Sequence, residues 1–197
     1  NPRNRVRFAK RLSRRGGVLF ARPTDEGISV IFRCTNEVTV RRDGTDCYNQ
    51  PRIAWTKVRV IAGRRRIAFV TWQVQLSLHA MQRHVERSAC PLTALLGQMD
   101  SCMTGALDWL DGADPLRDRE DEYLPNTTGV WAGGMDMLAP DPTWGAAFAG
   151  GARPLPVFSI HTFLGEAEML PTLWLQWSEK FPRRQTPSPF LVPRSAA

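Results

Sequence analysis

The residues of this chain best suited to chemistry are a histidine and two arginines at regular spacing. His79, Arg83 and Arg87 follow one another at intervals of four residues. On a helix, residues four apart project from one face. A histidine that titrates near neutral pH can move a proton, and guanidinium groups can stabilise charge on phosphate oxygens. This spacing favours a site for a phosphodiester that uses neither a metal nor a cofactor.

The same helix face also has a plainer interpretation. Exposed histidine and arginine side chains are common on surface helices, and Glu86 is well placed to pair with a neighbouring arginine. His84 lies about 140° around the helix from His79. We therefore expect His84 at the surface or the boundary, away from any shared site.

The sequence His-Ala-x-x-Arg-x-x-x-Arg, which follows a strand-rich region, resembles a motif of bacterial ribonuclease toxin domains of the barnase, EndoU, colicin and RelE type. The resemblance covers residues 77–87 and the later segment 156–164. It implies a small sheet beside the helix that adds polar residues to a cleft. The matching candidates here are Ser159, His161 and Thr162. The sheet that precedes the helix is larger than in such toxins.

The resemblance also implies roles for these residues in RNA cleavage. His79 or His161 would act as the base on the ribose 2′-hydroxyl, while Arg83 and Arg87 hold the phosphate. The products would be a cyclic phosphate end and a 5′-hydroxyl. The candidate catalytic residues are His79, Arg83, Arg87, His161 and Thr162.

Positive charge is concentrated in the first part of the chain. Residues 1–87 hold 19 of the 26 Lys and Arg residues and 6 of the 19 Asp and Glu residues, a net charge of +13, whereas the rest of the chain has −6. Basic surfaces attract polyanions, so the expected partner is nucleic acid, with RNA favoured over DNA and an acidic protein as the alternative. The competing interpretation is that the two parts neutralise each other across an internal interface.

A binding module without catalysis would use basic residues of the predicted strands. In segment 53–61, Trp55, Lys57 and Arg59 alternate onto one face, which predicts a half-exposed sheet with a basic side. The cations would follow a nucleic-acid backbone while Trp55 or Trp72 stacks on bases. The expected nucleic-acid-binding residues are Arg41, Arg42, Trp55, Lys57, Arg59, Arg64, Arg65 and Arg66. A third hypothesis is an interaction domain whose basic half docks an acidic partner.

The hydrophobic pattern predicts an α+β fold with an antiparallel sheet in the N-terminal half, a helical middle, a short strand pair and a C-terminal helix. Alternation with period two predicts strands near 18–21, 28–33, 37–42, 53–61 and 66–75. Ser77 suits the N-cap of a helix over 78–87, and a second helix is expected over 92–110. The acidic stretch 111–128 is expected to form a loop. Two short strands are expected at 130–132 and 156–164. A last helix near 167–180 requires Pro171 in its first turn.

The length of 197 residues fits one domain with a short extension at each end. We expect a basic arm over 1–15, either a short amphipathic helix or a flexible segment, a single domain over 16–180, and a loose Pro-rich tail over 181–197. No apolar run approaches the roughly 20 residues that span a bilayer. Four cysteines without CxxC pairing favour reduced thiols rather than a metal site, and a cytoplasmic location is expected.

Overall fold

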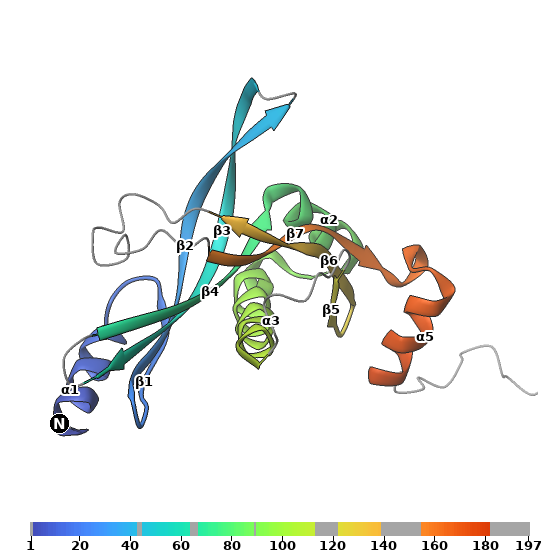
Figure 1. Cartoon of the computed structure of the whole chain (residues 1–197). Helices are drawn as coiled ribbons and strands as arrows, with labels where there is room; N and C mark the ends of the chain where they lie inside the picture. Colours follow the sequence, from blue (N-terminus) through green and yellow to red (C-terminus); the bar gives the residue numbers. More distant parts are fainter. Residues whose placement is uncertain are drawn as a thin grey trace, which may run out of the picture.

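A computed structural model describes residues 2–42, 45–63, 67–88, 90–112, 122–138 and 155–181. Its centre is a seven-stranded sheet in the order β1-β2-β3-β4-β7-β6-β5 (Figure 1). The strands are β1 (Val18–Pro23), β2 (Gly27–Arg42), β3 (Thr45–Ala62), β4 (Ile67–Ser77), β5 (Glu122–Asn126), β6 (Gly129–Leu138) and β7 (Leu155–Gly165). The helices are α1 (Pro2–Leu12), α2 (Leu78–Ser88), α3 (Leu92–Gly112) and α5 (Pro171–Lys180), with a short 3₁₀ turn, η2, at Glu166–Glu168.

The predicted α+β class is confirmed, and the two groups of strands form one sheet. β1 to β4 pair in sequence order and antiparallel, and β5, β6 and β7 do the same. The two groups meet at β4 and β7, which run parallel, with Gln75 opposite Ser159. A parallel pair needs a long crossover connection, and α2, α3, β5 and β6 supply it.

Several boundaries differ from those expected from the sequence. The predicted strands 28–33 and 37–42 form the single long strand β2, because its pairing with β3 continues from Gly27 to Arg42. Part of the predicted acidic loop, 122–126, is strand β5, which pairs with β6. The basic start of the chain is a helix over residues 2–12, whereas the tail beyond Phe181 lies outside the described residues.

The two faces of the sheet carry different layers. The main core lies between the sheet and helices α2 and α3, where Trp55, Leu76, Met103 and Phe158 are fully or almost fully buried. A smaller cluster lies on the opposite face, where Ala9 and Leu12 of α1 pack on apolar residues of β1 and β2. A third cluster joins α5 to β6 and β7.

The helix starts follow local rules that the sequence shows. Ser77 is the N-cap of α2, since its hydroxyl accepts a hydrogen bond of 3.1 Å from the backbone N–H of Ala80. Pro171 occupies the first turn of α5, where a missing N–H costs no helical bond. In the part of the chain that the structure describes, no helix has the length and apolar content needed to cross a membrane.

Candidate functional site

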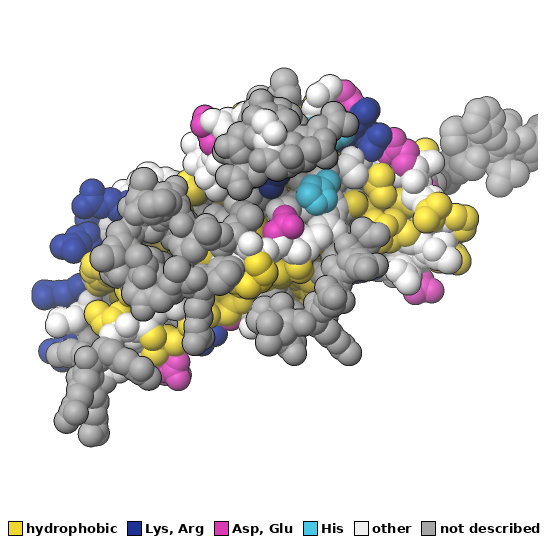
Figure 2. All heavy atoms as spheres, turned by 45° about the horizontal axis from the view of Figure 1, so that its top comes forward, with side chains coloured by type: hydrophobic (Ala, Val, Ile, Leu, Met, Phe, Trp, Pro, Cys, Tyr) yellow, Lys and Arg dark blue, Asp and Glu magenta, His cyan; other side chains and the backbone are white. Residues whose placement is uncertain are grey.

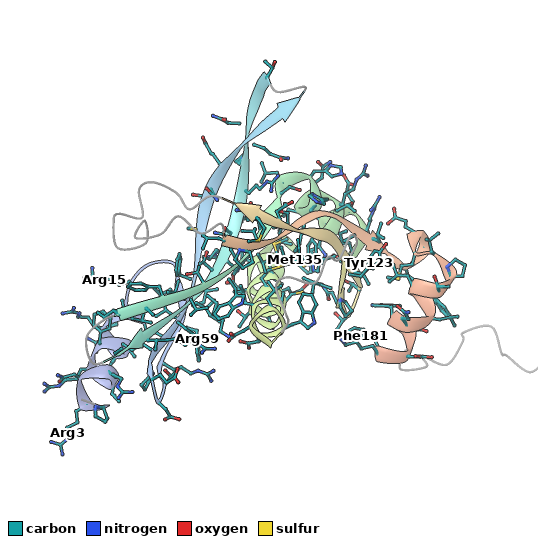
Figure 3. The ribbon with its side chains drawn as sticks, viewed as in Figure 1. Arg3, Arg15, Arg59, Tyr123, Met135 and Phe181 are labelled. Atoms are coloured by element: carbon teal, nitrogen blue, oxygen red, sulfur yellow. The ribbon has the colours of Figure 1, made fainter. Side chains whose placement is uncertain are left out.

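The basic side of β3 faces α3, and its charges are neutralised there. The ammonium group of Lys57 lies 2.7 Å from carboxylate oxygens of both Asp108 and Asp111. Arg59 donates to Asp111 at 3.1 Å and lies over the ring of Trp72. Figure 3 shows Arg59 beside α3, where these carboxylates are carried. Lys57 is only 4% exposed, so it is a buried ion-pair partner rather than a group open to a ligand.

The same arrangement continues about two turns earlier on α3. Arg33 of β2 donates to Asp100 at 2.7 Å, and the indole N–H of Trp55 donates to the same carboxylate at 2.8 Å. Trp55 is fully buried and Trp72 is 9% exposed. These two rings are therefore part of the core between sheet and helix and present no free face for base stacking. Internal neutralisation, one of the two interpretations of the charge pattern, holds for Arg33, Lys57 and Arg59.

The other residues expected to bind nucleic acid are not placed by the structure. The side chains of Arg41 and Arg42, at the end of β2, are not described, and Arg64, Arg65 and Arg66 lie outside the described residues. Their role stays a prediction.

The predicted catalytic face of α2 has one exposed histidine and two arginines that are already paired. His79 is exposed in the first turn. Arg83 donates to Glu86 at 3.1 Å. A hydrogen bond from the Gln82 amide and the neighbouring Arg83 lower the pKa of the Glu86 carboxyl, which keeps the partner of Arg83 ionised. This pair is the plainer alternative that the sequence suggested.

The side chain of Arg87 is already bonded to residues at the end of β7 and in η2. Its guanidinium donates to the backbone carbonyl of Phe163 and forms an ion pair of 2.6 Å with Glu168 of η2. The three side chains thus share a helix, but Arg83 and Arg87 hold carboxylates of this chain. A phosphate on this face would have to displace Glu86 and Glu168.

His84 is buried, which contradicts its predicted place at the surface. Its ring lies 4.7 Å from that of Trp131 and 4.6 Å from that of Phe163, and none of it is exposed. Burial lowers the pKa of His84, and its Nδ1 has no hydrogen-bond partner within the described structure. His79 and His84 do lie in different surroundings, one exposed and one buried, but β6 and β7 cover the side of α2 that was expected to be open.

His161 and Thr162 lie on β7, the strand that runs beside α2. The register between β6 and β7 shifts here, since Ala132 pairs with Thr162 and Gly133 pairs with Ile160. His161 is the extra residue of this β-bulge, and its side chain is exposed, whereas Thr162 is half-buried. Bulges are frequent next to functional sites, where they turn a side chain out of the regular alternation.

Comparison of this chain with protein-family models, with curated proteins and with solved structures gives no match. The resemblance of residues 77–87 to bacterial ribonuclease toxins therefore stays a prediction.

Cations without carboxylate partners gather at the α1 end of the molecule. We call this set the α1 basic surface; its members are Arg7, Lys10, Arg11, Arg14, Arg15 and Arg22. All six side chains are exposed, and within the described ranges none of them forms an ion pair. Figure 2 shows Lys and Arg side chains along the end of the molecule that α1 and β1 occupy. In Figure 3, the labelled Arg3 at the same end points away from the sheet.

Exposed aromatic rings lie among these cations. Arg11 covers the ring of Phe8 at 5.4 Å, and Arg22 covers the ring of Phe20 at 5.3 Å. Phe8 and Phe20 are 42% and 40% exposed, so each ring keeps a surface that a ligand can reach. Alternating guanidinium and aromatic groups suit a single-stranded nucleic acid, whose phosphates and bases need both.

The sequence analysis missed a second polar cluster on the face of the sheet opposite α3. It contains Arg52 of β3, Gln75 of β4 and Ser159 of β7, with Gln50 beside them. The signal was available in the alternation of β4, where Gln73 and Gln75 point away from the apolar residues on either side. The odd-numbered face of β3, with Lys57 and Arg59, carries the more conspicuous charge pattern in the sequence.

Metal and thiol chemistry receive no support from the described residues. No group of three or more His, Cys, Asp or Glu side chains among them could hold a metal ion. Burial raises the pKa of the thiols of Cys34 and Cys102, which keeps them protonated and poorly nucleophilic at neutral pH.

Proposed function

We propose that this protein binds nucleic acid, with single-stranded RNA as the preferred form, through the α1 basic surface. The supporting observation is the contrast between two sets of cations. Arg33, Lys57 and Arg59 have carboxylate partners on α3, whereas the six cations of the α1 basic surface are exposed and have no such partner in the described part of the chain. Unmatched cations attract phosphates because contact releases condensed counterions.

A nucleic acid fits this surface better than a lipid bilayer does. A helix that lies in a membrane interface needs a broad apolar face free for insertion. In α1 the apolar side is already used, since Ala9 is 2% exposed and Leu12 packs against the strands. The large apolar side chains of α1 that are left exposed are those of Val6 and Phe8.

The dependence of RNA affinity on salt tests this proposal. Binding of a labelled single-stranded RNA of mixed sequence would be followed by fluorescence anisotropy over a range of salt concentrations. Each phosphate contact contributes about −0.7 to the slope of log K against log salt for single strands. Contacts from all six cations would give a slope of about −4, and the variant R11Q/R14Q/R15Q is expected to reduce its magnitude by about 2.

The matched control removes cations that already have partners. Arg59→Gln and Arg83→Gln lower the net charge but should leave the slope unchanged, because Asp111 and Glu86 hold these groups. A flat salt response, or a triple variant that binds like the unmodified protein, would contradict the proposal. Tighter binding to polyglutamate than to RNA would indicate an acidic protein partner instead.

Ribonuclease activity is a second candidate, favoured by the position of two exposed histidines on packed neighbouring elements. His79 lies at the start of α2, and His161 is turned out by the bulge of β7, along which α2 packs. Incubation with mixed RNA in excess EDTA should release cyclic-phosphate ends, and His79→Ala or His161→Ala should abolish their release without changing the fold. Intact RNA would reject this candidate and leave the binding proposal standing.

A further inference from the structure

The guanidinium of Arg52 is half-buried, and its contacts within the described residues are all with uncharged groups. Its Nη1 donates to Oε1 of Gln75 at 3.2 Å and approaches Oγ of Ser159 at 3.5 Å, and its Nη2 approaches Oε1 of Gln50 at 3.5 Å. Its Nε is buried and has no hydrogen-bond partner among the residues that the structure describes. In the described structure no carboxylate forms an ion pair with Arg52.

In contrast to Arg52, other buried or half-buried cations of the same sheet and of α2 have carboxylate partners. Arg33, Lys57 and Arg87 each have a carboxylate within 2.6 to 2.7 Å. A charge removed from water is costly unless an opposite charge and full hydrogen bonding compensate for it. Among the described residues, Arg52 therefore has the long, neutral contacts of a cation that lacks a counterion.

A chain of buried amides fixes the groups around Arg52. The side-chain amide of Gln75 donates to Oε1 of Gln73 at 3.0 Å, and that of Gln73 donates to Oγ1 of Thr56 at 3.0 Å. Because the Gln75 nitrogen is used in this way, its oxygen is turned to Arg52. Gln75 and Ser159 are fully buried, so their positions are set before any ligand arrives.

The location is one where open sheets commonly bind ligands. Arg52 pairs with Ser77, the last residue of β4, and Ser159 lies on the adjoining part of β7. β4 and β7 form a parallel pair, and the carboxyl ends of parallel strands at a change of strand order are frequent ligand sites. The exposed bulge residue His161 follows two positions after Ser159.

From these observations we infer that Arg52 is the cationic centre of an oxyanion site that takes a phosphate group, with Gln75 and Ser159 as its positioning residues. A guanidinium fork matches two oxygens of a phosphate, and the buried oxygens of Gln75 and Ser159 hold this fork in place from behind. This site is separate from the α1 basic surface. It neither requires the proposed RNA binding nor follows from it.

Inorganic phosphate is the probe that tests this site. In a ¹⁵N-labelled full chain, the Nε–Hε resonance of Arg52 should shift with added phosphate and saturate, while sodium chloride of equal ionic strength should not move it. Arg52→Gln should weaken phosphate binding by roughly tenfold or more, because a charge-assisted pair of hydrogen bonds is lost. Arg52→Lys, which keeps the charge without the fork, should lose most of the affinity as well.

The controls separate this inference from the RNA proposal. Arg59→Gln removes an equal charge from a carboxylate-paired position and should bind phosphate normally, as should the R11Q/R14Q/R15Q variant. Arg52→Gln should keep the salt slope of RNA binding. A saturable response to acetate equal to that with phosphate would mean a general carboxylate site and would overturn the phosphate assignment. If Arg52→Gln does not fold, the wild-type resonance decides: no saturable shift in the millimolar range overturns the inference.

Discussion

The ion pairs of Lys57 offer the sharpest test of how the charge of this protein is arranged. The Lys57 side chain is 5% exposed, and its two partners differ, since Asp108 is 59% exposed and Asp111 is 16% exposed. The perturbation is the pair of isosteric changes Asp108→Asn and Asp111→Asn. Together they leave the ammonium group buried between sheet and helix without a carboxylate.

The expected loss of stability follows from these exposures. Asp108→Asn alone should cost at most about 1 kcal/mol, because an exposed ion pair is screened by water. The double variant should cost about 3–5 kcal/mol, the usual effect of leaving a buried charge uncompensated. For a chain of this size that corresponds to a fall in Tm of about 6–20 °C.

Urea unfolding followed by tryptophan fluorescence measures these differences, and a third substitution supplies the control. Lys57→Met in the double-variant background removes the stranded charge and keeps a similar volume, so it should restore most of the lost stability. If the double variant loses less than about 1 kcal/mol, or if Lys57→Met brings nothing back, Lys57 is not held by α3 as described.

Two further predictions concern the packing of the core and the sheet. Burial lowers the pKa of His84 in the folded protein, so the unfolded protein binds a proton near pH 6.5 more readily than the folded protein does. The free energy of unfolding should therefore fall as the pH drops from 7 to 5, by up to about 1.4 kcal/mol per pH unit. His84→Phe should flatten this dependence in urea titrations and His79→Gln should not; equal slopes in all three proteins would refute the burial argument. A Cβ on Gly27 would lie 1.8 Å from the Val60 carbonyl oxygen, so Gly27→Ala should lower the free energy of unfolding by about 1–3 kcal/mol. A Cβ on Gly97 of α3 would meet open space, so Gly97→Ala should raise the free energy of unfolding by about 0.5–1 kcal/mol.

Much of the fold was predictable because its signals are local. Alternation of apolar residues located the strands of the first half, Ser77 marked the start of α2, and Pro171 marked the start of α5. These features depend on φ, ψ preferences and on nearby hydrogen bonds, which a short stretch of sequence determines. Strand β5 was missed because its few residues adjoin an acidic stretch typical of a loop.

Which charged side chains are buried, and with which partners they pair, was much less predictable from the sequence. The sequence showed that Trp55, Lys57 and Arg59 share one face of a strand, and the structure places them on one face. It did not show that α3 lies against that face with Asp100, Asp108 and Asp111 turned to it. The same limit applies to Arg87, whose partner Glu168 lies more than 80 positions away in the chain.

By itself, the sequence determined which residues form strands and helices and which of them share a face, because periodicity acts within one element. Only the tertiary structure decided which face is covered and by what. That choice sets whether a cation meets a carboxylate of its own chain, as Lys57 does, or has no carboxylate partner among the described residues, as in the α1 basic surface and at Arg52. Burial and charge pairing depend on contacts between distant segments, and no local pattern encodes these contacts.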